Sequence, residues 1–303
     1  MADAMGRAGR RVWPWLGLVG ALWALWGCEP ELTEPLFREQ VFADLDAGGM
    51  DDAVVGPVSE DLTGTWALVG DWSTCVTVFG TDELRTRYIH RVKIVQEGVH
   101  LHETHTVCAA VNTPLLGLET VVSDAILAAA SPLEVESVVI GTPGRLGYDG
   151  GVQVQLWGIR LDDPLDERMP LASELPDARI YDSDEDGHDG ATLSIGGDAC
   201  EVYIVQRSIS SVHGTLQPDG TIVGSGYMAT EQTVLDASNA FCASPYATVS
   251  NDAWSFTRLV RVDEDGMDLD TDGDGEVDCA EILAARTSLG TFLEPDRTRC
   301  EDP

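Results

Sequence analysis

The sequence predicts an all-β protein, an antiparallel β-barrel or β-sandwich followed by a short C-terminal acidic loop and a helix. Between residues 61 and 262, short runs rich in Val, Ile, Thr and aromatic residues are separated by turns that contain Gly, Pro or Asp. Several runs alternate apolar and polar residues, which is the pattern of a strand with one buried face. Many short strands joined by tight turns are typical of antiparallel barrels and sandwiches.

Ten runs are the expected strands. In the run VQVQLW at residues 152–157, the valines and the leucine point to one face, and the glutamines and the tryptophan point to the other. A Gln-Pro-Asp-Gly turn at residues 217–220 joins two runs and predicts a hairpin. One helical run, residues 124–131, follows Ser123 as its N-cap. The expected strands cover residues 65–69, 75–79, 88–95, 99–107, 136–140, 152–161, 192–195, 201–210, 221–228 and 255–262.

The composition excludes some partners and favours others. The chain has 303 residues, of which 44% are hydrophobic, and this is enough for one large core or two modest ones. The formal net charge is −34, and Lys93 is the only lysine. Such a surface repels a phosphate backbone, so we expect no binding to nucleic acid. The same acidity is compatible with high solubility and with cation binding.

The N-terminal segment has the pattern of an export signal. Arg7, Arg10 and Arg11 form a basic start, and residues 12–27 are uncharged and mostly apolar. This apolar run is shorter than the roughly 20 residues that a membrane-spanning helix needs. It fits the apolar region of a signal peptide that covers residues 1–27, which predicts a protein of the cell envelope.

The signal ends at Leu25, Gly27 and Cys28, and this spacing resembles the lipobox of bacterial lipoproteins. In that family the cysteine carries a diacylglycerol on its thiol, and the signal is removed before it. The resemblance implies a lipid anchor on Cys28. Because Glu29 follows instead of an aspartate, it also implies an outer-membrane address, facing the periplasm or the cell surface. The alternatives are an ordinary secreted protein cleaved nearby and an uncleaved anchor.

Three segments follow the signal peptide. Residues 28–60 are acidic with scattered Pro and Gly, so we expect a tether between lipid and folded domain, with a short helix near residues 37–45. Residues 61–262 carry the strand pattern of the β-domain. Residues 263–303 carry the acidic loop and the last helical pattern.

Six cysteines besides Cys28 indicate disulfide bonds. An even number in an exported chain is compatible with three disulfides, and no C-x-x-C pair points to a metal site. Fifteen pairings of six cysteines exist, and the sequence does not choose among them. The simplest pairing joins neighbours along the chain, namely Cys75–Cys108, Cys200–Cys242 and Cys279–Cys300.

The first strand begins with Gly64, Thr65 and Trp66, which resembles the G-x-W start of lipocalins and the similar start of avidins. In those barrels an arginine from a late strand lies across the tryptophan, and Arg258 or Arg261 would take this place. The resemblance implies a barrel that carries a small apolar ligand. The alternative is that Trp66 is an ordinary core residue.

The acidic segment after the last strand has the spacing of an EF-hand-like calcium loop. Gly275 stands at the sixth position, where the loop turns sharply, and Glu281 at the twelfth, where a bidentate carboxylate closes the coordination sphere. This many oxygen ligands suit Ca²⁺ better than Mg²⁺, which keeps more of its waters. Positions 1, 3, 5, 7, 9 and 12 are Asp270, Asp272, Asp274, Glu276, Asp278 and Glu281.

The flanks of this loop differ from those of a complete EF-hand. A helical run at residues 280–289 leaves the loop and ends at Gly290, whereas residues 262–269, which enter it, are not helical. The loop is therefore similar to the one-helix calcium loops of dockerins and thrombospondin type 3 repeats. This resemblance implies a structural calcium site rather than a calcium sensor. The alternative is a solvated acidic tail.

A second acidic loop contains the same D-x-D-x-D-G core. Its candidate metal ligands are Asp182, Asp184, Asp186 and His188. Position 12 would be Leu193, so the closing carboxylate has to come from elsewhere, from Asp189, Asp198 or Glu201. The alternative is a polar turn between strands.

Three histidines offer a further candidate metal site. His100 and His102 share one face of an expected strand, and His90 on the preceding strand could complete a zinc site. The alternative is an exposed polar strand face.

No nucleophile elbow, phosphate-binding loop or dinucleotide-binding glycine pattern is present, so we expect no enzyme. The sequence predicts a lipid-anchored calcium-binding protein of structural or binding type. A lipocalin-like carrier of a small apolar ligand is the alternative.

Overall fold

The computed structural model of the chain describes residues 60–77, 81–114, 119–130, 132–142, 145–197, 200–239, 247–249 and 255–289. These residues belong to one compact unit, and their dominant element is an antiparallel sheet of eleven strands. The prediction of an all-β fold is therefore confirmed. The expected signal peptide, Cys28 and nearly all of the tether lie outside the described residues.

Each pair of neighbouring strands in this sheet is antiparallel. The first strand merges two predicted runs, and Gly70 lies between them because a Cβ there would meet the ring of Trp72 at 1.9 Å. In the described residues the strands are β1 (Gly64–Thr77), β2 (Thr81–Glu97), β3 (His100–Asn112), β4 (Thr120–Val122), β5 (Leu133–Thr142), β6 (Arg145–Trp157), β7 (Ala191–Ile195), β8 (Cys200–Leu216), β9 (Ile222–Ala237), β10 (Ala247–Val249) and β11 (Phe256–Arg261).

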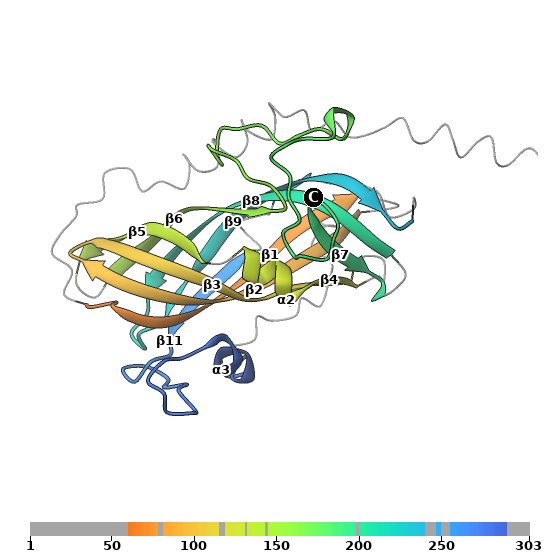
Figure 1. The fold of residues 1–303 in the computed structure, drawn as a ribbon. Helices are drawn as coiled ribbons and strands as arrows, with labels where there is room; N and C mark the ends of the chain where they lie inside the picture. The colour runs from red at the N-terminus through yellow and green to blue at the C-terminus, as the bar shows by residue number, and fades with distance from the viewer. Residues whose placement is uncertain are drawn as a thin grey trace, which may run out of the picture. The chain divides into compact units, whose positions relative to one another are not determined.

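The strand pairings close the sheet into a ring, so the fold is a barrel (Figure 1). In the ring β1, β2, β3, β5, β6, β8, β9 and β11 each pair with the next, and β11 returns to β1. Because successive ring strands along the chain are neighbours, this is an up-and-down barrel without an open edge in the ring. Of the two expected architectures, the structure has the barrel.

Two short strands complete the wall at one end of the barrel. β3 pairs with β5 through residues 100–105 and with β4 at Val111. In the same way β8 pairs with β6 through residues 206–215 and with β7 through residues 200–204. β4 and β7 also pair with each other. The gap between β3 and β8 is therefore filled by β5 and β6 along one part of its length and by β4 and β7 along the other.

The interior of the barrel holds the main apolar core. Successive residues of β1 face opposite sides, as Trp66 and Leu68 belong to this core and Ala67 and Val69 to a separate cluster. The core takes residues from all eight strands of the ring, and only the inner face of a closed ring brings these together. The cluster of Ala67 and Val69 therefore lies on the outer face of the barrel.

The inner face of β6 is polar in its middle part. The expected alternation is present, but Gln153 and Gln155 are buried, whereas Val152 is 41% exposed. Gln153 and Gln155 lie opposite Ser210 and Ser208 of β8. The centre of the barrel is thus lined by amide and hydroxyl groups, with apolar residues on either side.

The C-terminal segment covers part of the outer face of the barrel. Leu269, Val277 and Ile282 form one buried cluster with Val69 of β1 and Val260 of β11. Figure 1 shows this segment, with α3 (Cys279–Ala284), outside the sheet near β11. We call residues 263–289 the C-terminal cover.

A disulfide bond attaches this cover to the barrel wall. Cys108 of β3 is bonded to Cys279 at the start of α3, across 171 residues of sequence. Two of the expected disulfides are therefore wrong, Cys75–Cys108 and Cys279–Cys300. The packing of α3 against β3 brings together cysteines that lie far apart in the chain. Cys200 is also disulfide-bonded, with a partner outside the described side chains, so Cys200–Cys242 stays a prediction.

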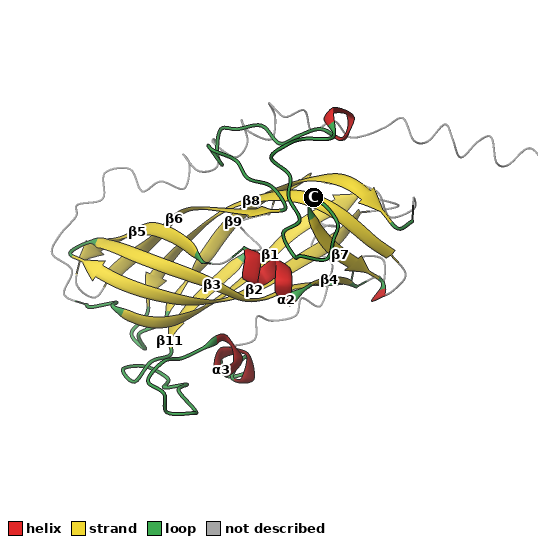
Figure 2. Cartoon of the chain, viewed as in Figure 1, coloured by secondary structure: helices red, strands yellow, loops and turns green. Residues whose placement is uncertain are grey.

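A second cover lies over the outer face of β8 and β9. Between β6 and β7 the chain leaves the sheet for residues 158–190, drawn as a long green loop in Figure 2. Val205 of β8 is buried in a small apolar cluster with side chains of this segment. Arg207, two residues further on, donates from Nη1 to the carbonyl oxygens of Pro164 and Glu167, at 2.8 and 2.7 Å. We call residues 158–190 the loop cover.

In the described part of the chain, three short helices accompany the strands. In α2 (Asp124–Ala129), Ser123 is the N-cap and accepts a hydrogen bond from the main-chain N–H of Ile126, as predicted. The 3₁₀ helix η1 (Ala172–Glu174) lies in the loop cover. The helix after the acidic loop, α3, ends at Ala284, so it is shorter than the sequence predicted. The hairpin predicted at residues 217–220 joins β8 to β9.

Candidate metal sites

The first acidic loop lies between two anchored points of the C-terminal cover. Leu269, immediately before the loop, and Ile282, immediately after it, are buried against the barrel. Turns lead into the loop and α3 leads out of it, as the sequence predicted. The ends of the loop Asp270–Glu281 are therefore held by apolar packing and by the disulfide at Cys279.

Three aspartates converge inside this loop. Asp270, Asp272 and Asp274 each place one carboxylate oxygen within 4.8 Å of the others. The carboxylate of Asp270 accepts hydrogen bonds from the main-chain N–H groups of Gly273 and Gly275, at 2.7 and 2.9 Å. Gly275 has a φ of +88°, which glycine adopts without strain, so it suits the sharp turn at position 6. Three carboxylates this close repel one another, and a cation between them relieves the repulsion.

Glu281, the expected closing residue, reaches back across the loop. Its carboxylate accepts hydrogen bonds from the main-chain N–H and the hydroxyl of Thr271, at 2.6 and 2.9 Å, and from the N–H of Asp278 at 3.0 Å. These hydrogen bonds lower the pKa of Glu281, and the bond from the Asp278 N–H has the largest effect. Glu281 therefore holds a negative charge beside the entrance of the loop.

The other two predicted residues of this loop point elsewhere. Asp278 is the N-cap of α3, and its side chain accepts a hydrogen bond from the main-chain N–H of Glu281 at 2.9 Å. The carboxylate of Glu276 lies 3.4 Å from Nζ of Lys93. Glu276 is therefore a candidate ligand through its main-chain carbonyl, which is the group that position 7 supplies.

The second acidic loop ends the loop cover, immediately before β7. Asp182, Asp184 and Asp186 each place one carboxylate oxygen within 4.8 Å of the others. The main-chain N–H of Ser183 donates to the carbonyl of Gly190 at 2.9 Å and closes the base of the loop. The three aspartates that the sequence proposed for this loop are therefore brought together.

Asp184 has an unpaired acceptor within this group. Its Oδ1 is buried and has no hydrogen-bond partner among the described residues, while Oδ2 accepts a hydrogen bond from the N–H of Thr192 at 3.0 Å. Burial raises the pKa of Asp184, and the nearby carboxylates of Asp186 and Asp182 raise it further. A cation among the three carboxylates would both pair this oxygen and lower that pKa.

The remaining expected contributors to the second loop lie elsewhere. Leu193, at position 12, is buried in the barrel, so this position supplies no carboxylate. The imidazole of His188 stacks on the ring of Tyr203 with centroids 4.1 Å apart, and at position 7 of the loop His188 would bind through its main-chain carbonyl. Glu201, an expected helper, accepts a hydrogen bond from the hydroxyl of Tyr203 at 3.3 Å. Asp198 lies outside the described residues.

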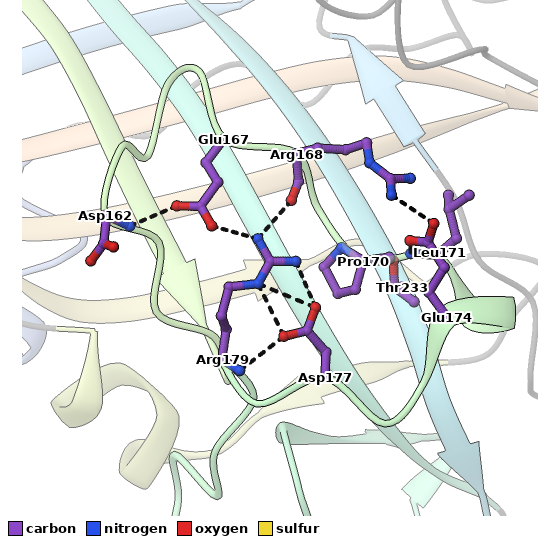
Figure 3. A network of polar contacts seen from close by, with 9 residues as sticks. All are labelled: Asp162, Glu167, Arg168, Pro170, Leu171, Glu174, Asp177, Arg179 and Thr233. Atoms are coloured by element: carbon purple, nitrogen blue, oxygen red, sulfur yellow. Dashed lines mark hydrogen bonds and ion pairs between the residues drawn. The ribbon is translucent and has the colours of Figure 1, made fainter.

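An ion-pair network stiffens the loop cover just before the second loop (Figure 3). Arg179 binds Asp177 with Nε and Nη2, at 3.0 and 2.6 Å, and Glu167 with Nη1 at 2.6 Å. Its Nη1 also donates to the carbonyl of Arg168 at 3.0 Å. The hydrogen bonds from the Arg179 side chain lower the pKa of Asp177 to about 2. The network therefore holds two distant parts of the loop cover together.

The histidines do not assemble as the sequence proposed for zinc. His100 is exposed, and His102 on the outer face binds the carboxylate of Glu136 at 2.6 Å. His90 instead lies inside the barrel beside His105, with their Nδ1 atoms 3.3 Å apart. His90 and the pair His100 and His102 therefore lie on opposite faces of the sheet.

A buried acid accompanies the inner histidine pair. Glu103 accepts hydrogen bonds from Nε2 of His105 at 2.8 Å, from the hydroxyl of Tyr148 at 2.9 Å, and from the hydroxyl of Ser137. Burial raises the pKa of Tyr148 well above its ordinary value. Burial, together with the neighbouring His105, lowers the pKa of His90 to about 3, so His90 is neutral at pH 7. Sequence reasoning missed this cluster, for which the alternation in VHLHETH was the only signal.

The strand register distinguishes between the two arginines proposed to lie over Trp66. Arg261 is directly opposite Trp66 and shares its side of the sheet, whereas Arg258 belongs to the other face. The guanidinium of Arg261 binds the carboxylates of Asp263 and Asp265, at 2.7 and 2.9 Å. Arg261 therefore links the end of the barrel to the start of the C-terminal cover.

Chemically, the two acidic loops are candidate cation sites built from hard carboxylate oxygens.

In the part of the chain that the structure describes, no helix has the length and apolar character to cross a bilayer. No protein-family model matches the chain, and no curated protein matches it.

Proposed function

We propose that the protein is a lipid-anchored, exported calcium-binding protein of structural or binding type. The observation that carries this proposal is the loop Asp270–Glu281, where three carboxylates converge and that of Glu281 is held charged beside the loop entrance. Calcium takes six to eight oxygen ligands, and carboxylates at alternate positions with a closing glutamate supply them. The barrel itself offers no comparable group of acidic residues among those described.

The positions of the two loops suggest what calcium does. The first loop interrupts the C-terminal cover between side chains that pack on β1 and β11. The second lies at the end of the loop cover, which packs on β8. A metal that orders a loop lowers the entropy cost of ordering the segment around it. We infer that calcium fastens both covers to the outer wall of the barrel.

The two sites differ in expected strength. The first has three converging aspartates and the closing carboxylate of Glu281, whereas position 12 of the second is the buried Leu193. The unpaired Oδ1 of Asp184 supports a cation at the second site nonetheless. Both can be weak and still be filled, because extracellular calcium modules work at about 10⁻⁴–10⁻³ M.

Export is the second part of the proposal. The signal peptide and the acylated Cys28 lie outside the described residues and stay predictions. The disulfide between Cys108 and Cys279 supports them, because structural disulfides persist in oxidising compartments and are rare in the cytosol.

Thermal unfolding in calcium and in EDTA tests the calcium proposal. If the stronger site has a dissociation constant near 10⁻⁴ M, 10 mM free Ca²⁺ stabilises the fold by about 2.7 kcal/mol relative to EDTA. We expect the Tm to rise by roughly 5–10 °C. Magnesium at equal ionic strength is the control and should give a smaller shift. Identical curves in EDTA, Ca²⁺ and Mg²⁺ would refute calcium binding.

A carrier of a small apolar ligand is the other function that the sequence suggested. The up-and-down topology agrees with such a carrier. The interior does not favour it, because two cavities that line the described interior of the barrel measure about 20 and 30 Å³, too little for a lipid-sized ligand. The calcium proposal is therefore the one that the geometry supports better.

A further inference from the structure

Four side chains that line one cavity inside the barrel each carry a polar atom without a partner among the described residues. Nε1 of Trp72 and Nε2 of His90, Gln153 and Gln155 are buried without a hydrogen-bond partner among the described residues. These side chains come from β1, β2 and β6, are between 4% and 8% exposed, and line a cavity of about 20 Å³. Buried polar groups in native proteins nearly always have hydrogen-bond partners. Four unpaired groups around the same cavity therefore indicate that a molecule occupies it.

We propose that this cavity is a binding site for a compact, uncharged ligand that carries a hydroxyl or an amide group. Its walls are apolar, hydroxyl, amide, indole and imidazole groups, without an Asp, Glu, Lys or Arg among the described residues. Burying an ion there without a counter-charge would be costly. The occupant is therefore neutral, and it must hydrogen-bond.

The imidazole of His90 explains why a hydroxyl or an amide suits the cavity. A neutral imidazole has one N–H and one lone pair, and the Nδ1 of His90 lies 3.3 Å from Nδ1 of His105. Because Nε2 of His105 donates to Glu103, Nδ1 of a neutral His105 accepts from Nδ1 of His90, and Nε2 of His90 is left as an acceptor. The side-chain amides of Gln153 and Gln155 also offer both donors and an acceptor. A ligand that both donates and accepts can pair with all of them.

A second cavity extends the site. It measures about 30 Å³ and shares Tyr88 and Met228 with the first. It is also lined by Trp157, whose indole nitrogen is buried without a partner among the described residues. Methionine side chains adapt their shape easily, so movement of Met228 can join the two cavities. Together they suit a ligand of a few non-hydrogen atoms better than one water.

Nuclear magnetic resonance with two small probes tests this proposal. Acetamide and ethylene glycol are titrated separately into the ¹⁵N-labelled protein in calcium buffer, and the indole N–H signal of Trp72 is assigned with the Trp72→Phe variant. We expect a saturable shift of this signal with half-saturation at millimolar probe, as the size of these probes allows. The probe that binds more tightly identifies the amide or the hydroxyl as the recognised group.

The Gln155→Met variant distinguishes a ligand-binding site from a cavity that holds only water. It keeps the size of the side chain and removes its hydrogen bonds, so we expect at least a tenfold loss of probe affinity. We also expect a higher Tm, because a buried unpaired amide is removed. Val152→Thr, on the exposed face of the same strand, is the control and should change neither. If neither probe gives a saturable shift, or if Gln155→Met binds as the wild type does, ordered water alone fills the cavity and the proposal is overturned.

Discussion

Two glutamates of the first acidic loop show how the structure assigns roles to similar residues. Glu276 extends its carboxylate to Lys93, away from the three aspartates. Glu281 turns back over the loop, where Thr271 and Asp278 bind its two oxygens. Both glutamates were predicted ligands, but Glu281 alone holds its carboxylate across the loop. This difference makes the pair a matched test of the site.

The Glu281→Gln substitution should weaken calcium binding strongly. It removes a charge and one of the two oxygens that close the coordination sphere, and a charged interaction of this kind contributes roughly 1.5–3 kcal/mol. We expect half-saturation in a calcium titration followed by Tm to rise about 10- to 100-fold. Glu276→Gln is the control, since position 7 binds through its main chain, and its half-saturation should stay near that of the wild type. Equal effects of the two substitutions would contradict the assigned loop register.

At the scale of elements, the two covers are held by different means. The C-terminal cover has a disulfide and an apolar cluster on β1 and β11. The loop cover has a small apolar cluster with Val205 and hydrogen bonds from Arg207, and Arg179 holds its own parts together. Each cover also contains one acidic loop. The barrel wall is continuous through main-chain hydrogen bonds, so the covers are the parts whose attachment depends on side chains.

The network of Arg179 predicts a pH dependence. The folded pKa of Asp177 is about 2, below its ordinary value of 3.8, so this carboxylate stabilises the folded state above about pH 4. The contribution is lost as the pH falls toward 2. We expect the Tm difference between wild type and Asp177→Asn to be constant above pH 5 and to shrink toward zero near pH 2. Asp162→Asn is the control, because Arg179 does not bind that carboxylate, and an equal pH trend in both variants would contradict the assignment.

Removal of the disulfide should destabilise the protein substantially. In the double variant Cys108→Ser with Cys279→Ser, the unfolded chain regains the freedom that a crosslink over 171 residues removes. We expect the free energy of unfolding in urea to fall by about 3–5 kcal/mol. Substituting both cysteines avoids a free thiol that could form new disulfides. A decrease below about 1 kcal/mol would show that packing alone holds the C-terminal cover.

At the scale of the whole molecule, the net charge bears on the proposed membrane anchor. A chain with a formal charge of −34 carries strong self-repulsion, and calcium at the two proposed sites would reduce it where the carboxylates are closest. An anionic membrane surface repels such a protein, so residence at a membrane requires a covalent anchor. The lipobox proposed at Cys28 would supply that anchor.

The Cys28→Ser substitution tests the anchor directly. Without the thiol no diacylglycerol can be attached, so the variant should move from the membrane fraction to the soluble fraction of a bacterial host that processes lipoproteins. Cell fractionation with immunoblotting measures this change. Cys200→Ser in the same host controls for general loss of folding. A Cys28→Ser protein that stays with the membrane would show that the lipobox prediction is wrong.

Features that depend on neighbours in the chain could be predicted. The alternation in β6, the N-cap Ser123 and the hairpin at residues 217–220 each follow from a few consecutive residues. The grouping of Asp270, Asp272 and Asp274 belongs to the same class, because the loop spacing itself brings their carboxylates together. The length of α3 was overestimated, since the helical pattern continues past the residue where the structure ends the helix.

The sequence alone determined that the protein is antiparallel β and that it carries two acidic loops, because strand alternation and loop spacing are local properties. Only the tertiary structure decided that the strands close into a ring, that Cys108 pairs with Cys279, and that the glutamines of β6 face inward. It also decided that Asp184 keeps an unpaired oxygen and that His90 meets His105 inside the barrel. Each of these depends on residues far apart in the chain, which packing and strand register bring together.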